Sequence, residues 1–286
     1  MLRKGDLTQG GITGTLLHFT LPMMVGSFLQ QCYNIADTLI VGQCIGAGAL
    51  AAVGSAYTLM VFLISVLLGL AMGSGTVFSL HYGAGNHVAL RRSIFSSFVL
   101  IGIVTLILNV AVFIWLDPIL RLLQVPQDIY GMMRSYSWII FCGIVFTFIY
   151  NFYASLLRAV GDSVTPLWFL AVSVVLNIAL DLFFILQLDW GIQGAAAATV
   201  LAQGVAALGI IIYTYRRRPE LRWHHEDMCF DRTCLKEIAS FSTLTCVQQS
   251  VMNLGILMIQ GLVNSFGTAV MAAFAAAVKI DSFAYM

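Results

Sequence analysis

Four polar residues in apolar surroundings combine oxygen-bearing side chains with a spacing that could bind a small cation. Asn177 and Asp181 are four residues apart, so a helix would place them on one face, one turn from each other. Asp37 and Thr199 lie in two other apolar stretches of the chain. Carboxylate, amide and hydroxyl oxygens are hard ligands that suit a small cation, and a pair of acids also suits the uptake and release of a proton. The residue types leave both chemistries open.

The composition indicates what kind of chain carries these residues. Hydrophobic residues make up 60% of the 286 residues and charged residues 9%, whereas a soluble domain has roughly 25% charged residues. So few charges cannot cover a soluble globule, and a formal net charge of +1 gives no basic surface for nucleic acid. The composition therefore excludes a soluble enzyme, a disordered chain and a nucleic-acid-binding protein, and it indicates an integral membrane protein.

Long apolar runs predict the fold class, which is an all-α polytopic membrane protein. A helix needs about 20 residues to cross the hydrocarbon core, and a transmembrane barrel would instead show short alternating segments. We predict spans at 15–41, 50–80, 94–116, 132–157, 164–188, 192–215, 238–264 and 268–286. Residues 1–215 then form a first, complete six-helix bundle, 216–237 a cytoplasmic linker, and 238–286 the first two helices of a second, incomplete bundle.

Basic residues predict the orientation, because lysine and arginine favour cytoplasmic loops. The loops on the opposite side hold only Arg121 and Arg134. Apart from Lys279 in the last predicted span, the other basic residues gather at the N-terminus and in alternate loops: Arg3, Lys4, Arg91, Arg92, Arg158, Arg216, Arg217, Arg218, Arg222, Arg232 and Lys236. We expect a multi-pass protein of the cell (inner or plasma) membrane with a cytoplasmic N-terminus. We interpret the run 216–218 as a topology signal and a contact for anionic lipid, rather than a nucleic-acid or regulatory element.

The chain also resembles itself at a separation of about 221 residues, where Phe19 corresponds to Phe241 and Gly46 to Gly267. Six predicted helices separate the two copies, so both copies begin on the same side of the membrane. This pattern predicts a parallel repeat with a pseudo-two-fold axis along the membrane normal. Two such repeats need about 440 residues, so we expect a fragment or a truncated product of a longer protein.

Depth in the membrane brings the polar residues to one layer. At about 1.5 Å per residue, Asp37, Asp181 and Thr199 lie within roughly 6–11 Å of the outer ends of their helices. A carboxylate inside the bilayer is costly, so these two acids and Asp281 are functional candidates. The alternative is that the polar residues only hydrogen-bond between helices, which Asn or Ser would do without a charge.

Two further patterns have structural interpretations. Loop 224–234 holds two histidines and two cysteines, but their spacing fits no usual zinc site, so we expect a solvated linker. The pairs Gly42/Gly46 and Gly69/Gly73 have the four-residue spacing of close helix contacts, with hinge motion as the alternative.

Ordered motifs along the whole chain resemble the multidrug and toxic compound extrusion (MATE) family, in the bacterial branch of DinF-like and MepA-like exporters. These motifs are Phe19-x-x-Pro22, the stretch Tyr33 to Thr38 leading to Gly42, Ala51-Ala52-Val53-Gly54, Arg158-Ala159-Val160-Gly161-Asp162, Asn177-x-x-x-Asp181 with Gly191 to Thr199, Ser265-Phe266-Gly267 and Lys279-Ile280-Asp281-Ser282.

The resemblance implies a twelve-helix secondary transporter, not an enzyme, that alternates between inward and outward openings. Such a protein exports cationic or amphipathic drugs in exchange for Na+ or H+, and it needs no cofactor beyond the coupling ion. We expect a monomer in the lipid bilayer. The resemblance assigns the cation or proton site, where Na+ could bind, to Asp37, Asn177, Asp181 and Thr199. It suggests a cavity lining that includes Tyr33, Asn34, Asn151 and Gln248.

Three other functions are less well supported by the sequence. A lipid-linked precursor flippase of the same superfamily is the closest rival, but it needs a cationic cavity, and the only charged residues well inside the complete spans are acidic. A membrane-embedded enzyme would need a nucleophile with a partner base or a metal set. An ion channel would need a filter-like loop or a ring of charge, and neither is visible in the sequence.

Overall fold

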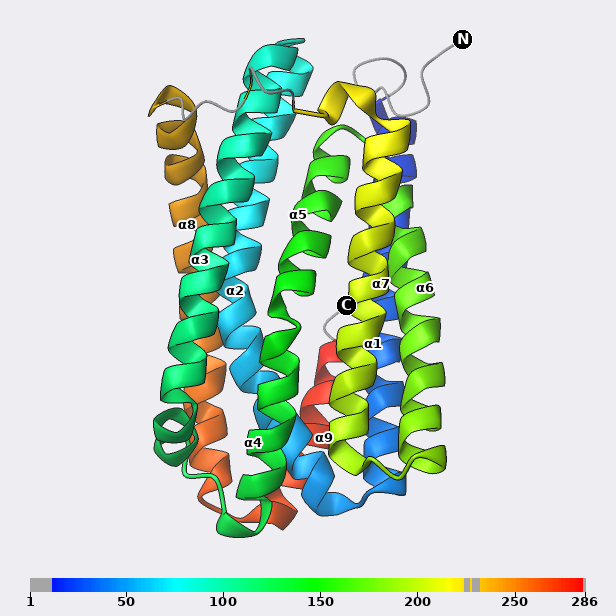
Figure 1. The fold of residues 1–286 in the computed structure, drawn as a ribbon, viewed down its shortest axis with the longest axis vertical. Helices are drawn as coiled ribbons and strands as arrows, with labels where there is room; N and C mark the ends of the chain where they lie inside the picture. Colours follow the sequence, from blue (N-terminus) through cyan, green and yellow to red (C-terminus); the bar gives the residue numbers. More distant parts are fainter. Residues whose placement is uncertain (1–11, 224–226, 228–231, 285–286) are drawn as a thin grey trace.

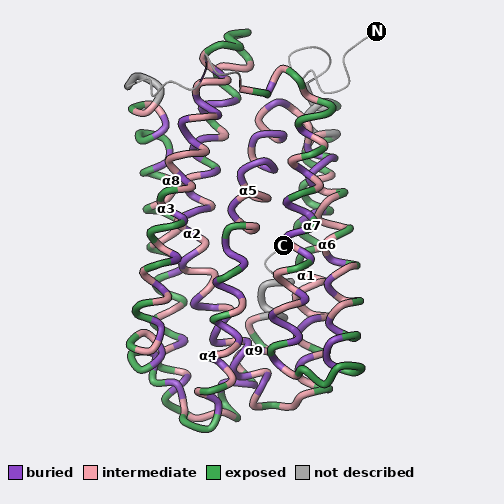
Figure 2. Tube along the Cα trace, viewed as in Figure 1, coloured by how far each residue is buried: buried purple, intermediate pink, exposed green. Residues whose placement is uncertain are grey.

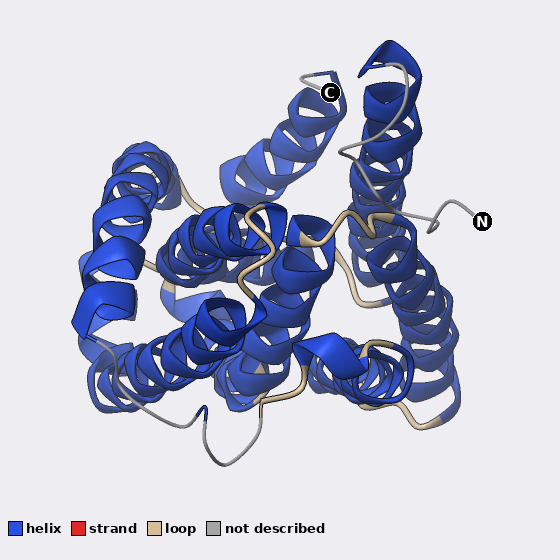
Figure 3. Cartoon of the chain, turned by 90° about the horizontal axis from the view of Figure 1, so that it is seen from above, coloured by secondary structure: helices blue, strands red, loops and turns tan. Residues whose placement is uncertain are grey.

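The computed structural model describes residues 12–223, 227 and 232–284, and every regular element among these residues is helical (Figures 1 and 3). The elements in chain order are α1 (Ile12–Cys44), α2 (Ala47–Gly83), α3 (His87–Leu122), α4 (Gln127–Cys142), α5 (Ile144–Ala159), α6 (Val164–Leu182), the π-helical η1 (Phe183–Gln187), α7 (Gly191–Arg217), the 3-10 turn η2 (Pro219–Leu221), α8 (Arg232–Asn264) and α9 (Thr268–Ala284). Arg3, Lys4 and most of loop 224–234 lie outside the described residues.

Most of the predicted spans correspond to long apolar helices. By length and composition, five of the described helices could cross a membrane, namely α2, α3, α6 with η1, α7 and α8, and the bent pair α4–α5 makes a sixth. Helix α1 is not among them; its second half carries Gln30, Gln31, Asn34 and Asp37. The described apolar part of α9 is short, Thr268–Val278. The membrane spans of α1 and α9 therefore stay predictions.

The fourth predicted span, 132–157, is not one straight helix. It is divided at Gly143 into α4 and α5, which are bent by 47°. A β-carbon on Gly143 would lie 2.5 Å from Val200 Cγ2, so glycine lets this bend pack against α7. The amide of Asn109 donates to the Phe141 carbonyl at 3.1 Å, which satisfies a backbone group beside the break. Hydropathy does not register such a break, because both halves are apolar.

Helix α2 lies at the centre of the molecule. It packs against α1, α3, α4, α5, α8 and α9, and many of its residues are buried, as are those of α5 (Figure 2). Small side chains permit the contacts with α8 and α9. A β-carbon on Gly54 would lie 2.3 Å from Ala275 Cβ, so α2 and α9 touch almost backbone to backbone there.

Helices α2 and α8 meet along an antiparallel contact that we call the α2–α8 seam. It comprises Ser55, Thr58, Gly69, Gly73 and His81 of α2, which face Asn264, Gln260, Cys246, Ser242 and Glu237 of α8, in that order. A β-carbon on Gly69 would lie 2.4 Å from Cys246 Cα. The predicted close packing of the Gly69/Gly73 pair is therefore confirmed, and its partner is α8.

The same prediction is wrong for the Gly42/Gly46 pair. A β-carbon on Gly42 would make an ordinary 3.5 Å contact with the Leu50 side chain, and one on Gly46 would meet nothing within 4 Å. Gly46 lies beyond the end of α1, in the tight turn to α2, with a φ of 115° that favours glycine. Gly267, at the corresponding repeat position, also precedes a helix and has a φ of 92°.

Most basic residues that the structure describes lie at one end of the bundle, drawn uppermost in Figure 1. The chain direction places Arg91 and Arg92 at the start of α3, Arg158 at the end of α5 and the 216–218 run at the end of α7. Arg121 and Arg134 lie at the other end, near the α3–α4 connection. The charge asymmetry read from the sequence thus follows the long axis of the molecule.

Candidate cation or proton site

Helices α6 and α7 pack against each other and bring Asn177, Asp181 and Thr199 together. The Asn177 amide is best satisfied when its nitrogen donates to Asp181 Oδ2 at 2.8 Å and its oxygen faces Thr199. In this orientation the Asn177 oxygen accepts from the Thr199 backbone N–H at 3.1 Å and lies 3.3 Å from Thr199 Oγ1. Asn177 is 2% exposed and Asp181 is fully buried. The one-turn spacing of Asn177 and Asp181 therefore places both side chains in a single buried cluster.

The second carboxylate comes from α1, which packs against α6 and α7. Asp37 is buried, and it lies near enough to Asp181 for the two charges to interact directly. Both acids belong to the half of the bundle drawn lower in Figure 1, toward the end of α1 and the start of α7. Two acids so close together in a poorly solvated region repel each other when both are ionised. The arrangement therefore favours a bound cation or proton.

One carboxylate oxygen of the cluster lacks a hydrogen-bond donor among the described residues. Asp181 Oδ1 is buried and has no hydrogen-bond partner among the described residues. A buried carboxylate oxygen without a donor is costly, because it has left water and gained no compensating interaction. A proton on Asp181 or a cation beside it would remove this cost.

Tyrosine hydroxyls surround the carboxylates. Tyr33 of α1 shares a hydrogen bond with the Thr199 side chain, and Tyr57 of α2 shares one with Asn34. Tyr136 of α4 is buried within electrostatic range of Asp37. Sequence reasoning missed Tyr57 and Tyr136. The only signal for them was a hydroxyl inside an apolar run, which many packing tyrosines share.

The structure separates the predicted cavity-lining residues into two groups. Tyr33 and Asn34 lie on α1 beside the cluster, where the Asn34 amide also donates to Gln31 Oε1 at 2.9 Å. Asn151 is half-buried on α5 and donates to the Thr147 carbonyl one turn earlier at 2.8 Å. Gln248 is exposed on α8. Neither of these two observations places Asn151 or Gln248 beside the carboxylates.

The donor set fits a hard cation or a proton. Among the described residues, no three His, Cys, Asp or Glu side chains gather as a metal group. The cluster offers two carboxylates together with neutral amide and hydroxyl oxygens, which suit a weakly held monovalent cation. The side chain of Asp281, the third acid predicted inside the membrane, lies outside the described residues.

Comparisons with known proteins agree on one family. A family model described as MatE matches residues 22–183, which include Asp37, Asn177 and Asp181. The probable multidrug resistance protein YpnP of Bacillus subtilis (strain 168) is 33% identical over 98% of this chain and 63% of its own length. The multidrug export protein MepA of Staphylococcus saprophyticus is 31% identical over 71% of this chain and 45% of its own length.

A solved structure has the same fold. The MATE multidrug transporter DinF-BH, determined in complex with the dye rhodamine 6G, superposes with a TM-score of 0.90 and 26% sequence identity. The match covers 99% of this chain and 63% of that protein. The matches to YpnP and DinF-BH cover nearly all of this chain but only about 60% of the length of those proteins.

Proposed function

Because the chain belongs to the multidrug and toxic compound extrusion (MATE) family of multi-pass membrane transporters, we propose that the protein is a cation-coupled antiporter that exports cationic or amphipathic organic compounds. The observation that carries the proposal is the buried pair Asp37 and Asp181, with Asp181 Oδ1 lacking a donor among the described residues. The names of its relatives, which refer to multidrug resistance and export, support the class of exported compound.

The coupling step follows from the charge of the cluster. With a proton or Na+ bound, the two carboxylates are partly neutralised and the cluster is stable in a dry environment. Without it, the excess negative charge favours a positively charged compound or a conformation in which water reaches the acids. Ion and substrate thus favour different states, and coupling is the difference in their affinities for those states.

Each residue of the cluster has a distinct part in this proposal. Asn177 holds Asp181 by donating to Oδ2, which leaves Oδ1 facing the place of the coupling ion. Thr199 contributes a hydroxyl and fixes the Asn177 amide through its own backbone N–H. Tyr33 reaches Thr199 from α1, so it links the helix that carries Asp37 to α7.

Alternating access also requires that packed helices separate on one side of the membrane at a time. We place this movement at the α2–α8 seam, because α8 follows the connection from α7 and begins the predicted second bundle. Hydrogen bonds join one end of the seam, and His81 lies 3.3 Å from Glu237 at the other end. Its middle is a close contact of small residues with one hydrogen bond, from Ser242 to the Leu70 carbonyl. Polar contacts at the ends can be exchanged for water when one end opens.

The proposal is tested with purified protein in sealed vesicles loaded with the same rhodamine dye. A Na+ gradient at equal pH and a pH gradient without Na+ are imposed separately, and efflux of the dye is followed by fluorescence. We expect one of the two gradients to accelerate efflux, which identifies the coupling ion. If neither gradient drives efflux of the dye or of other organic cations, antiport is overturned and the flippase alternative gains support.

We further propose that the N-terminus and the basic end of the bundle face the cytoplasm, that the membrane is the plasma membrane, and that the protein acts as a monomer. Basic residues gather at the end where α7 and α5 finish, and such clusters favour the cytoplasmic side. The Arg217→Cys variant should be labelled by an impermeant thiol reagent in inverted vesicles and protected in intact cells.

A further inference from the structure

A groove separate from the carboxylate cluster lies near the basic end of the molecule. It has a volume of about 520 Å³, and its walls come from α3, α5, α7 and the segment that follows η2. Residues of different helices line it, among them Phe98, Tyr153, Ile212, Tyr215, Arg216 and Trp223. Ile212 is 51% exposed, so the groove opens on the outer surface of the bundle, which faces lipid in a membrane protein.

Aromatic rings form a rigid wall of the groove. The Trp223 ring lies 5.6 Å from that of Phe98 and 6.2 Å from that of Tyr215, measured between centroids. Phe98 in turn contacts the ring of Tyr153 at 6.4 Å. Rings that pack on one another lose little freedom when a ligand binds, and tryptophan and tyrosine favour the boundary between hydrocarbon and water. The wall suits an apolar chain with a polar end.

Arg216 supplies a charge at this groove. Its side chain is exposed and has no ion-pair partner among the described residues. Two other arginines near this end of the bundle are occupied, because Arg91 pairs with Asp227 at 2.7 Å and Arg222 donates to the Tyr215 carbonyl. A guanidinium whose charge is not neutralised can pair with a phosphate through two parallel hydrogen bonds.

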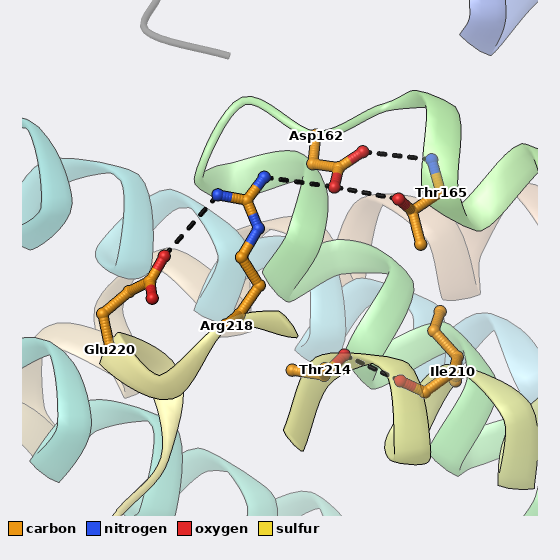
Figure 4. A network of polar contacts seen from close by, with 6 residues as sticks. All are labelled: Asp162, Thr165, Ile210, Thr214, Arg218 and Glu220. Atoms are coloured by element: carbon orange, nitrogen blue, oxygen red, sulfur yellow. Dashed lines mark hydrogen bonds and ion pairs between the residues drawn. The ribbon is translucent and has the colours of Figure 1, made fainter. Parts of the chain in front are cut away.

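Arg218, two residues further along, differs from Arg216 because it has ion-pair partners (Figure 4). It lies 3.2 Å from Asp162 Oδ2 and 3.5 Å from Glu220 Oε1. Asp162 also accepts from the Thr165 backbone N–H and hydroxyl, so it caps α6 and anchors Arg218 at the same time. Asp162 and Glu220 therefore neutralise the charge of Arg218. The charge of Arg216 stays available for a partner outside the protein.

We infer that the groove binds an anionic phospholipid, with its phosphate paired to Arg216 and an acyl chain lying between Ile212 and Trp223. Charge complementarity selects this occupant, since basic pockets between membrane helices bind acidic headgroups, and the apolar wall gives an acyl chain a surface to pack against. The inference does not depend on the coupling ion or on the exported compound.

The test uses purified protein in a neutral detergent, titrated with phosphatidylglycerol or phosphatidylcholine and measured by native mass spectrometry. We expect phosphatidylglycerol to bind, and Arg216→Gln to weaken its binding about tenfold, because a charge-assisted contact is lost. Arg217→Gln is the matched control: Arg217 is exposed, adjacent and not part of the groove wall, so binding should stay within about twofold. Equal loss in both variants would overturn a defined site.

A second variant keeps every charge and fills the groove. Ile212→Trp should weaken phosphatidylglycerol binding without changing the number of arginines, and thermal unfolding reports whether each variant is folded. A third measurement adds inorganic phosphate as a competitor of phosphatidylglycerol. If phosphate alone displaces phosphatidylglycerol at millimolar concentration, the site takes a free anion and the lipid assignment is wrong. If phosphate has no effect and Ile212→Trp blocks binding, the assignment stands even where Arg216→Gln fails to fold.

Discussion

Gly73 of α2 lies so close to Ser242 of α8 that a β-carbon on Gly73 would come within 2.3 Å of Ser242 Cα. The Ser242 hydroxyl donates to the Leu70 carbonyl of α2 at 3.2 Å, so the two helices are also joined by a hydrogen bond. Small residues at such crossings let membrane helices gain close van der Waals contact, which is a main source of their association. Helix α2, at the centre of the bundle, therefore packs closely against α8 at this point.

Substituting valine for Gly73 should therefore disrupt the α2–α8 seam. The side chain has no space against the Ser242 backbone, and overpacking of this kind costs about 1–3 kcal/mol. We expect a lower midpoint of thermal unfolding in detergent. Gly83→Ala is the control, because Gly83 is also in α2 and a β-carbon there meets nothing within 4 Å. Equal unfolding midpoints for Gly73→Val and the unchanged protein would contradict the close contact.

The other end of the seam is joined by a buried polar network around Gln260. The Gln260 amide donates to Ser55 Oγ at 2.9 Å and Asn264 Oδ1 at 2.8 Å, and its oxygen accepts from Thr58 Oγ1 at 3.2 Å. The Asn264 amide extends the network to the Leu123 carbonyl at 2.8 Å. All four polar side chains are buried, so they bond to one another and to the carbonyls of Gly54 and Leu123.

We predict that Gln260→Leu destabilises the protein although it adds apolar surface. The substitution removes one buried hydrogen bond each from Ser55, Thr58 and Asn264, which together cost about 1–3 kcal/mol. Gln248→Leu makes the same change on the exposed face of the same helix and should have little effect. The measurement is denaturant or thermal unfolding of both variants side by side. A larger loss for Gln248→Leu would show that the network is not what holds the seam.

Helical spacing and depth were enough to predict that four polar residues of the first six spans lie in one layer. Asn177 and Asp181 share a helix face by spacing alone, and the direction of each span placed Asp37 and Thr199 at a similar depth. Both inferences need only the helical rise and the span ends. Their convergence also requires that α1, α6 and α7 be neighbours, which spacing and depth do not determine, and their role in coupling stays a prediction.

Contacts between distant segments could not be predicted in the same way. The break at Gly143 depends on Val200 and Asn109, which come from two other helices. Tyr136 lies within electrostatic range of the cluster because α4 packs against α2 and α7, and hydropathy carries no sign of these contacts. The Gly42/Gly46 pattern failed for a related reason: a four-residue spacing implies contact only while both residues stay in one helix, and α1 ends at Cys44.

A disulfide across the seam should stop transport if the seam must open. In a background without the native cysteines, Ser55→Cys with Asn264→Cys places two thiols where a hydrogen bond of 3.1 Å now joins the side chains. We expect oxidation to lower efflux of the rhodamine dye at least tenfold, and a reductant to restore it. Each single-cysteine variant controls for loss of the polar network. Full efflux in the cross-linked protein would place the movement elsewhere.

The sharpest prediction concerns Asp181. Asp181→Asn removes the buried charge and keeps the shape of the side chain, so the folded protein should be as stable as before or more stable, because the charge repulsion between Asp181 and Asp37 has been removed. Gradient-driven efflux of the rhodamine dye should nevertheless fall at least tenfold, since an amide neither binds nor releases a proton and holds Na+ weakly. Asp189→Asn is the matched control: Asp189 is exposed in the turn before α7 with a φ of 52°, which asparagine tolerates. Asp37→Asn should reproduce the loss of efflux with normal expression. A protein that unfolds at lower temperature after Asp181→Asn would indicate that the carboxylate acts in packing, and unchanged efflux in either variant would show that this cluster does not couple the ion to export.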